Sequence, residues 1–382
     1  MASVYVVVPA GIHDPARPSG GNVYDRRVCR GLADGGWTVH ELEAAGAWPW
    51  PDASARAGLA LVIRGIPDGA VVVIDGLIAS AVGEVLVPER SRLRLVVLVH
   101  MPLGAGPSQR GVTAPLHQGV VDTRENERAA LSAAAAVVTT SAWTKDWLLD
   151  EYELRADRVH VAQPGVDAAE VALGTPAGGE LLCVATLTPG KGHDLLLAAL
   201  ATLADLPWRC LCAGSVERDR DFADDLGRLA RDARFGDRVR FVGPLDGADL
   251  DLAYAQADAL VLASRAETYG MVVTEALARG IPVVATSVGG LPEALGGTED
   301  GRPGLLVPPD DPAALAAALR RWLTDARLRQ RLREAALDRR ATLLGWETTT
   351  ARLAVVLAAA ARDEPAMANA ADFVTLNHAP GS

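Results

Sequence analysis

Short apolar runs rich in β-branched residues alternate with helical patterns along all 382 residues, and this alternation limits the fold more than any other feature. Strand-like runs separated by helices favour βαβ units and parallel sheets. Two sheets of six strands are predicted: 5–8, 38–42, 71–75, 94–100, 136–140 and 159–162 in the first half, and 181–185, 209–213, 239–242, 259–263, 283–286 and 304–307 in the second. The fold class is therefore α/β, with two Rossmann-like domains.

A break in this pattern marks the domain boundary. Residues 168–179 lose hydrophobic periodicity and gather glycine and proline, as a linker does. We predict a first domain at 1–166, a linker at 167–180, a second domain at 181–362 and a polar tail at 363–382, for which packing back on the first domain is one alternative. Open α/β sheets bind ligands beyond the carboxyl ends of their strands, so we expect the site in a cleft between the domains.

Composition argues against nucleic acid as a partner and against a segment that crosses a membrane. The formal net charge is −11 and no run of five basic residues occurs, which argues against nucleic acid. The longest apolar runs, such as 93–99 and 353–361, fall well short of the ~20 residues that cross a bilayer. No secretory signal is visible at the start of the sequence. A cytoplasmic protein without a transmembrane segment is expected.

The segment 259–293 carries the most chemistry. An apolar strand is followed by a loop, and then by a helix at 272–278 that Gly280 and Pro282 close. Free N–H groups at such a helix start suit a phosphate. Glu267 and Glu275 flank that start. On one continuous helix they would lie ~12 Å apart, too far for the ~5 to 5.5 Å or ~6.5 to 9.5 Å carboxylate pairs that cleave glycosides. A loop break between them allows closer approach but does not require it. Hydrogen bonding to hydroxyls at two ends of one ligand is the simpler role.

This segment resembles the E-x7-E region of family 4 glycosyltransferases, which are retaining enzymes of the GT-B fold. The likeness covers most of the chain. It implies that Glu267 faces the donor sugar and that Glu275 holds the ribose of the nucleotide. It also implies that backbone amides of the intervening loop meet sugar hydroxyls and phosphate, at Tyr269, Gly270, Met271 and Val272.

The loop that opens the second domain places Lys191 between two glycines, where it is expected to meet a diphosphate and offset charge on the leaving group. The family usually has Gly-Arg-Leu just before this loop, and its arginine shares the diphosphate. Here the matching residues are Ala-Thr-Leu, and Thr186 offers one neutral hydrogen bond. Arg265 or Arg218 could supply the missing charge, a hypothesis that rests on their loop positions.

Three further elements of the first domain match the family. Gly20 and Gly21 follow the first strand and resemble the glycine loop that approaches the donor phosphate. His100 ends a strand and, by resemblance, neighbours the reacting sugar, although a structural role is equally open. Ser141 matches the family's strand-end serine or simply caps a helix.

No metal or organic cofactor is expected beyond the nucleotide diphosphate sugar as co-substrate. Two D-x-D sequences occur, Asp219–Asp221 and Asp249–Asp251, but both fall at predicted helix starts, where aspartates cap or favour the dipole. No zinc-type spacing of histidine and cysteine is present.

The sequence therefore predicts a retaining, metal-independent transferase that moves a hexosyl unit from a nucleotide diphosphate sugar to a hydroxyl of a small-molecule or glycan acceptor. Two alternatives stay open: a non-hydrolysing sugar-nucleotide epimerase, and a catalytically idle sugar-nucleotide-binding protein, which Thr186 in place of arginine prompts. The base, the sugar, the acceptor and the oligomeric state are not encoded in any recognisable pattern.

Overall fold

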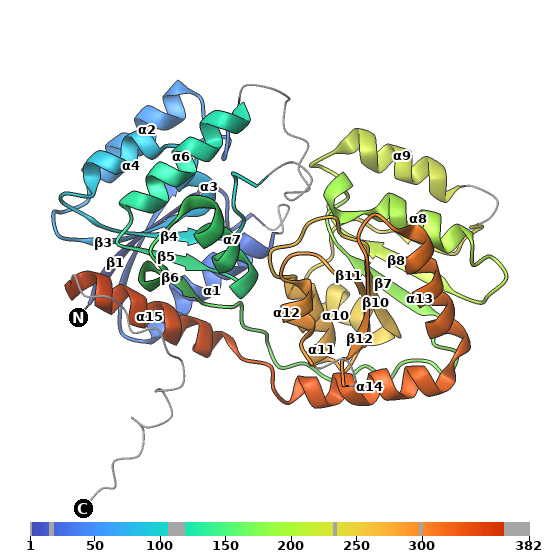
Figure 1. The fold of residues 1–382 in the computed structure, drawn as a ribbon. Coiled ribbons are helices and arrows are strands. Elements are labelled where there is room, and N and C mark those ends of the chain that lie inside the picture. The colour runs from blue at the N-terminus through green and yellow to red at the C-terminus, as the bar shows by residue number, and fades with distance from the viewer. Residues whose placement is uncertain (1, 15–18, 106–118, 232–234, 298–300, 363–382) are drawn as a thin grey trace, which may run out of the picture.

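The computed structural model describes residues 2–14, 19–105, 119–231, 235–297 and 301–362. Two six-stranded sheets form the centres of two domains that lie side by side (Figure 1). Every strand pairing is parallel, with the order β2-β1-β3-β4-β5-β6 in the first sheet and β12-β11-β10-β7-β8-β9 in the second. The predicted fold class, an α/β chain with two Rossmann-like sheets, is confirmed.

The first sheet has helices on both faces. Its strands are β1 (Ser3–Pro9), β2 (Thr38–Ala44), β3 (Val71–Asp75), β4 (Arg94–Val99), β5 (Ala136–Thr139) and β6 (Val159–Val161). One face packs on α2 (Ala53–Arg64), α3 (Gly76–Ala79), α4 (Gly83–Glu89), α6 (Gly119–Ala133) and α7 (Ala142–Tyr152), and the other on α1 (Gly20–Asp34) and α15 (Trp346–Arg362). Alternate residues of β3 point to opposite faces of the sheet. Val72 and Ile74 pack in the cluster with α2 to α7, and Val71 and Val73 pack in the cluster with α1 and α15. Burial on both faces explains why these strands are continuously apolar.

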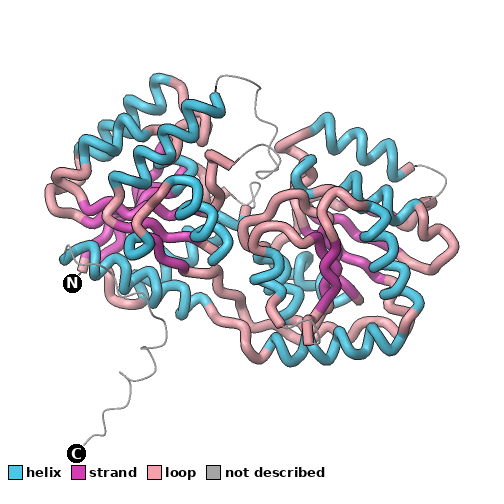
Figure 2. The backbone as a smooth tube through the Cα atoms, in the orientation of Figure 1, coloured by secondary structure: helices cyan, strands magenta, loops and turns pink. Residues whose placement is uncertain are grey.

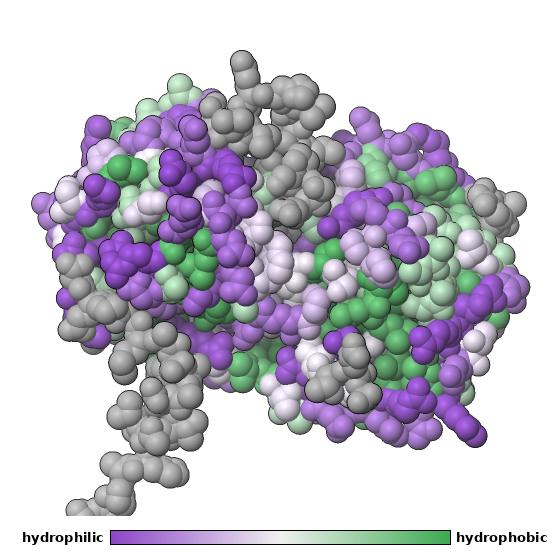
Figure 3. All heavy atoms as spheres, viewed as in Figure 1, coloured by the Kyte–Doolittle hydropathy of each residue, from purple (hydrophilic) through white to green (hydrophobic). Residues whose placement is uncertain are grey.

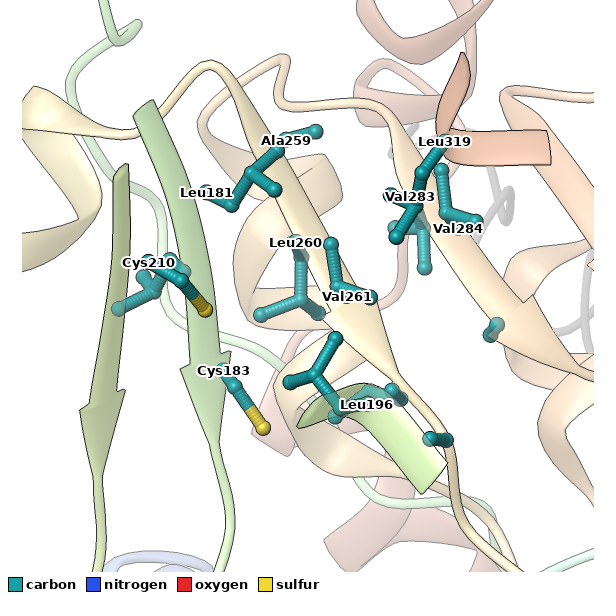
Figure 4. Packing of buried hydrophobic residues seen from close by; sticks show 14 of the residues in the cluster. Leu181, Cys183, Leu196, Cys210, Ala259, Leu260, Val261, Val283, Val284 and Leu319 are labelled. Carbon is teal, nitrogen blue, oxygen red and sulfur yellow. The ribbon is translucent and has the colours of Figure 1, made fainter. Parts of the chain in front are cut away.

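The second sheet is built in the same way. Its strands are β7 (Glu180–Val184), β8 (Arg209–Ala213), β9 (Val239–Phe241), β10 (Ala259–Leu262), β11 (Val283–Thr286) and β12 (Gly304–Val307). The helices are α8 (His193–Ala201), α9 (Arg220–Ala230), α10 (Gly247–Gln256), α11 (Met271–Ala278), α12 (Leu291–Leu295), α13 (Pro312–Thr324) and α14 (Ala326–Arg340). Figure 4 shows Leu181, Leu260 and Val283 of neighbouring strands in one buried cluster, with Leu196 of α8 and Leu319 of α13. Full burial of each leucine contributes ~1.5 to 3 kcal/mol.

The last described helix, α15, belongs to the first domain. Trp346, Leu353 and Leu357 are buried in the same cluster as Val4 and Val28. Figure 1 shows α15 against the first domain and α14 beneath the second. The chain therefore crosses back between α14 and α15, inside the range 181–362 that was predicted as the second domain, because the apolar face of α15 completes the first core. The tail at 363–382 lies outside the described residues.

Two crossings of the chain lie next to each other where the domains join. The N–H of Val166 donates to the carbonyl of Leu344 at 3.0 Å. Residues 168–175, within the predicted linker, contain no helix or strand, and the tube in Figure 2 shows loop here. The two connecting segments therefore pass between the domains side by side, one leading from the first domain to the second and the other returning.

The surface of the described residues is mixed. On the face drawn in Figure 3, hydrophilic residues cover most of the first domain, and hydrophobic residues gather on the second. Large hydrophobic side chains that are exposed are spread over several elements, namely Trp50, Leu61, Leu173, Leu229, Leu252, Leu337 and Leu344. None of the helices in the described ranges combines the length and apolar character needed to span a bilayer.

Candidate active site between the two domains

A cavity of about 390 Å³ lies between the domains and is lined by residues that follow the carboxyl ends of strands in both sheets. Gly20, Gly21, Asp75 and His100 line it from the first domain. The second domain contributes the predicted donor-binding residues, which are Thr186, Lys191, Arg218, Glu267, Tyr269, Gly270, Met271, Val272 and Glu275. The structure thus brings the predicted residues together, with the exception of Arg265 and Ser141.

A second hollow, of about 480 Å³, lies between α1 and α15 on the first domain. It includes Arg30, Trp37 and Glu347 and draws no residue from the second domain. Because the chemistry-bearing loops of both domains meet at the first cavity, whereas the second hollow is lined by the first domain alone, the first cavity is the candidate active site.

Lys191 and Glu267 form an ion pair in the cavity. Lys191 ends a short 3-10 turn, Pro189–Lys191, and Gly192 follows it with φ of 66°. A Cβ at Gly192 would lie 2.0 Å from the carbonyl oxygen of Ala263, so only glycine allows the Lys191 turn to pack against the end of β10. Both charged side chains are partly exposed, and each therefore remains accessible to a ligand.

The start of α11 lies between the two glutamates. Gly270 precedes the helix with φ of 93°, and a Cβ there would lie 2.5 Å from Cδ2 of Leu291. The N–H groups of Met271 and Val272 have no acceptor within the helix, because they belong to its first turn. They contribute the positive end of the helix dipole to the cavity.

A buried tyrosine fixes the side chain of Glu275 by a hydrogen bond. The hydroxyl of Tyr254, which is fully buried, donates to Oε2 of Glu275 at 2.7 Å. Arg279 stacks on the Tyr254 ring at 4.5 Å and pairs with Asp251. Burial raises the pKa of Glu275, and the Tyr254 hydroxyl opposes that rise. Tyr254 is a positioning residue for Glu275 that sequence reasoning missed.

The two arginines proposed to replace the family's diphosphate arginine differ. Arg265 donates to both oxygens of Asp194, at 2.9 and 2.7 Å, and to Asp310 at 2.6 Å, and it does not line the cavity. The hydrogen bonds that Arg265 donates to Asp194 hold the pKa of Arg265 above its usual range. Arg218 is exposed, lines the cavity and has no ion pair with any described residue. Arg265 is thus occupied by structural ion pairs, and Arg218 is available for a ligand.

His100 is packed against α1. A Cβ at Gly21 would lie 3.3 Å from the His100 ring, so glycine makes room for it. Nε2 of His100 is 2.8 Å from Oδ1 of Asp25 and 3.8 Å from Oδ2 of Asp75, and both aspartates are buried. Sequence reasoning missed both aspartates. The available signals were an aspartate on the apolar stripe of α1 and another at the end of the strand beside His100.

These three residues also form a group in which potential metal-ligating atoms lie within 4.8 Å of one another. A metal with ligands at ~2.0 to 2.2 Å in tetrahedral geometry would hold Nε2 and Oδ1 more than ~3 Å apart. The observed 2.8 Å is a hydrogen-bond distance. The geometry is that of a hydrogen bond.

Other polar residues singled out in the sequence have structural partners. The hydroxyl of Ser141 accepts from the N–H of Thr144 at 3.0 Å and caps α7, as one of its two predicted roles requires. Asp219 caps α9 by accepting from Phe222 at 3.0 Å, and Asp249 lies in the first turn of α10. The expectation that no metal is needed stays a prediction.

Comparison with known proteins identifies the family. Residues 177–339 match the model of glycosyl transferases group 1, and residues 70–170 match the model of glycosyltransferase family 4. The chain belongs to glycosyltransferase family 4. A curated relative of this family 4 chain is a D-inositol 3-phosphate glycosyltransferase from Frankia alni, 36% identical over 241 residues, which is 58% of each chain. Another is a glycogen synthase from Mycobacterium tuberculosis, 35% identical over 60% of this chain and 55% of that protein.

Solved structures share the fold. Sucrose-phosphate synthase from Thermosynechococcus elongatus matches with a TM-score of 0.75 and 23% identity, over 93% of this family 4 chain and 98% of that chain. HepE from Anabaena, in complex with UDP and glucose, matches with a TM-score of 0.70 and 18% identity, over 94% of this chain and all of that one. The matches to the first curated relatives span less than two thirds of their length, about 58% to 60%.

Proposed function

We propose that this family 4 chain is a retaining glycosyltransferase that moves a hexosyl group from a nucleotide diphosphate sugar to a hydroxyl of a small-molecule or glycan acceptor. One observation carries the proposal. The start of α11, the Lys191–Glu267 pair and Glu275 face Gly20, Gly21 and His100 across one cavity. A donor held by the second domain therefore presents its sugar to the first.

The donor's charge meets three positive features. In the proposed complex, Lys191, Arg218 and the free amides at the start of α11 bind the diphosphate. Glu267 gives up its contact with Lys191 and accepts hydrogen bonds from sugar hydroxyls, and Glu275 accepts them from ribose. HepE, a structural neighbour solved with UDP and glucose, supports a nucleotide-linked sugar as the donor class.

The reaction follows from this placement. The acceptor oxygen attacks the anomeric carbon on the face from which the diphosphate departs, the bond from that carbon to the phosphate oxygen breaks, and that oxygen takes the acceptor's proton. Lys191 and the α11 amides stabilise the negative charge that develops on the leaving group. His100 shapes the reacting face. Retention is an inference from the family, and closure of the two domains excludes water from the donor.

The test is binding followed by turnover. Thermal shift with a panel of UDP-, GDP- and ADP-sugars should reveal one class that raises Tm, because a ligand bound only by the folded chain stabilises it. That donor is then incubated with polyol, inositol and glycan acceptors while release of the nucleoside diphosphate is followed. The anomeric configuration of the product, read by NMR, tests retention.

The sequence contains two lysines, so a matched control is available. Lys191→Ala should reduce the donor-induced shift, and Lys145→Ala, outside the cavity, should preserve it. An epimer formed from the donor alone would favour the epimerase alternative. Donor binding without turnover on any acceptor would favour the idle binder. The cytoplasmic location stays a prediction from the sequence.

A further inference from the structure

Three elements of the first domain converge on one side chain in the cleft. His100 follows β4, Asp25 lies in the second turn of α1 and Asp75 ends β3. Nε2 of His100 lies 2.8 Å from Oδ1 of Asp25 and 3.8 Å from Oδ2 of Asp75. The ring also packs edge-on against Tyr24, with centroids 5.1 Å apart. His100 is thus fixed in one orientation, with Nε2 turned toward the carboxylates.

The two carboxylates are too buried to be ionised without compensation. Asp25 is 1% exposed and Asp75 is 4% exposed. Oδ1 of Asp75 accepts from the N–H of Leu77 at 2.6 Å, whereas Oδ2 of Asp25 has no hydrogen-bond partner among the described residues. Removing a carboxylate from water costs several kcal/mol unless a cation or donors offset it. The nearest group that can become a cation is the His100 ring.

The other charged or titratable groups around this cluster do not change that conclusion. From α1, the Tyr24 hydroxyl donates to the carbonyl of Ala162 at 2.8 Å and is unavailable to the aspartates. From α15, Arg352 donates to Gln163 at 3.2 Å. Across the cavity, Lys191 is paired with Glu267. The positive charge that balances Asp25 therefore resides on His100.

We propose that Asp25 is a positioning residue that holds His100 as an imidazolium in the cleft, so that its Nδ1–H donates to an oxygen of the bound donor. The hydrogen bond to the donor rests on the proposed function, whereas the protonation of His100 by way of Asp25 does not. Partial protonation of Asp75 near neutral pH limits the negative charge of the cluster. The imidazolium matters here because Thr186 is neutral and Arg265 is paired with Asp194 and Asp310.

The electrostatics of the cluster agree with this assignment. Burial lowers the pKa of His100, but the charge of Asp25, the hydrogen bond to it and the charge of Asp75 outweigh burial and raise that pKa to about 9. Burial and the charge of Asp25 raise the pKa of Asp75 to about 7. At neutral pH His100 is thus positively charged and hydrogen-bonded to Asp25.

The direct test is an NMR titration of His100 in the full chain without substrate. The protein is labelled with ¹³C and ¹⁵N at histidine, and the His100 signal is assigned as the one lost in His100→Gln. We expect a midpoint near 9 in the wild type. Asp25→Asn should lower it by more than one pH unit, and Asp75→Asn should lower it less, because Asp75 is farther from Nε2. A wild-type midpoint at or below about 6.5 would overturn the proposal.

Two further outcomes are decisive. If Asp25→Asn does not fold, the wild-type midpoint and the Asp75→Asn shift still test the assignment. Zn²⁺ added alone to the wild type should leave the His100 signal unchanged, and micromolar binding that shifts it would contradict us, because a metal-bound imidazole nitrogen carries no proton.

Enzyme activity tests the proposed hydrogen bond from His100 to the bound donor. The alkaline limb of the pH profile of kcat should move to lower pH in Asp25→Asn, while donor KM near neutral pH changes less than kcat. A kcat profile with the same alkaline limb in both proteins would refute a role in the reaction. Since the NMR titration needs no substrate, a failed search for an acceptor would count against the proposed function and leave the assignment of His100 standing.

Discussion

Glu293 of the second domain accepts hydrogen bonds from the backbone N–H of Ala142 in the first, at 2.9 Å to Oε2 and 3.0 Å to Oε1. The same carboxylate accepts from Trp143 at 3.3 Å and from the side chain of Gln163 at 2.6 Å. Ala142 and Trp143 are the first residues of α7, so a negative charge meets the positive end of a helix dipole across the domain interface. This contact joins the two halves of the candidate site.

Glu293→Gln should loosen the interface without unfolding either domain. It removes the charge that faces α7, a contribution of about 1 kcal/mol, which corresponds to a several-fold rise in donor KM if a closed cleft is the form that binds. Small-angle scattering should show a larger radius of gyration than for the wild type. Glu334→Gln, on the exposed surface of α14, is the matched control, and equal behaviour of the two variants would argue against an interdomain role.

Lys191→Ala should lower kcat about 10²- to 10³-fold, the range observed when one group that stabilises developing negative charge is removed. Its ion pair with Glu267 is partly exposed, so Tm should change little. Steady-state kinetics and thermal denaturation measure the two effects separately. A variant with wild-type kcat would exclude Lys191 from the reaction.

Arg265 and Arg218 should separate stability from donor binding. Arg265→Ala removes the bidentate pair with Asp194 and the pair with the exposed Asp310, and it is expected to destabilise the fold by about 1 kcal/mol. Arg218→Ala should leave Tm unchanged and raise donor KM, because Arg218 lines the cavity and pairs with no described residue. The reverse pattern, with Arg265→Ala stable and deficient in donor binding, would contradict the assignment.

Tyr254→Phe should leave the Glu275 carboxylate less well positioned to bind the donor. Loss of the hydroxyl removes a 2.7 Å hydrogen bond to a largely buried carboxylate, at a cost of about 1 to 3 kcal/mol. Donor KM should rise while kcat is largely retained, since Glu275 is assigned to ribose and lies apart from the bond that breaks. Tyr5→Phe, on β1, is the control for loss of a tyrosine hydroxyl elsewhere. Unchanged donor KM in Tyr254→Phe would refute its positioning role.

The His100 cluster predicts a sign for the pH dependence of stability. The folded-state pKa of His100 is raised to about 9 and that of Asp75 to about 7, so the folded chain binds more protons than the unfolded chain. The stabilising contribution of each group is present below its unfolded pKa and is lost as pH rises through the folded one. For His100 this window runs from about 6.5 to about 9.

Urea unfolding of the wild type and Asp25→Asn at pH 6 and pH 9 measures this effect. The free energy of unfolding should fall more in the wild type than in the variant over that interval, by a difference on the order of 1 to 3 kcal/mol. Parallel pH dependence in the two proteins would show that Asp25 does not set the protonation of His100.

The strands were predictable because burial on both faces makes each one a continuous apolar run. The predicted strand at 71–75 and that at 283–286 agree with β3 and β11. Lys191, Glu267 and Glu275 were found because each lies in a loop or helix directly after such a run. Local pattern therefore sufficed wherever the position of a side chain depends on its own strand end.

Contacts between distant segments were not predictable in the same way. Asp25 lies 75 residues from His100, and Glu293 lies 151 residues from Ala142. Asp25 is also on the apolar stripe of α1, and only the packing of α1 on the sheet shows which residue faces it. Arg265 is close to Glu267 in sequence, yet its side chain turns to Asp194. The amphipathic pattern of α15 predicts a buried face but does not say which domain that face covers.

Isothermal titration calorimetry of the purified chain with the sugar nucleotide chosen by thermal shift tests the central claim most directly. Saturable binding to one site per chain is expected in the wild type and in Lys145→Ala, with affinity at least tenfold weaker in Lys191→Ala and in Glu275→Ala. Absence of binding to every nucleotide sugar, or equal affinity in all four proteins, would contradict the account.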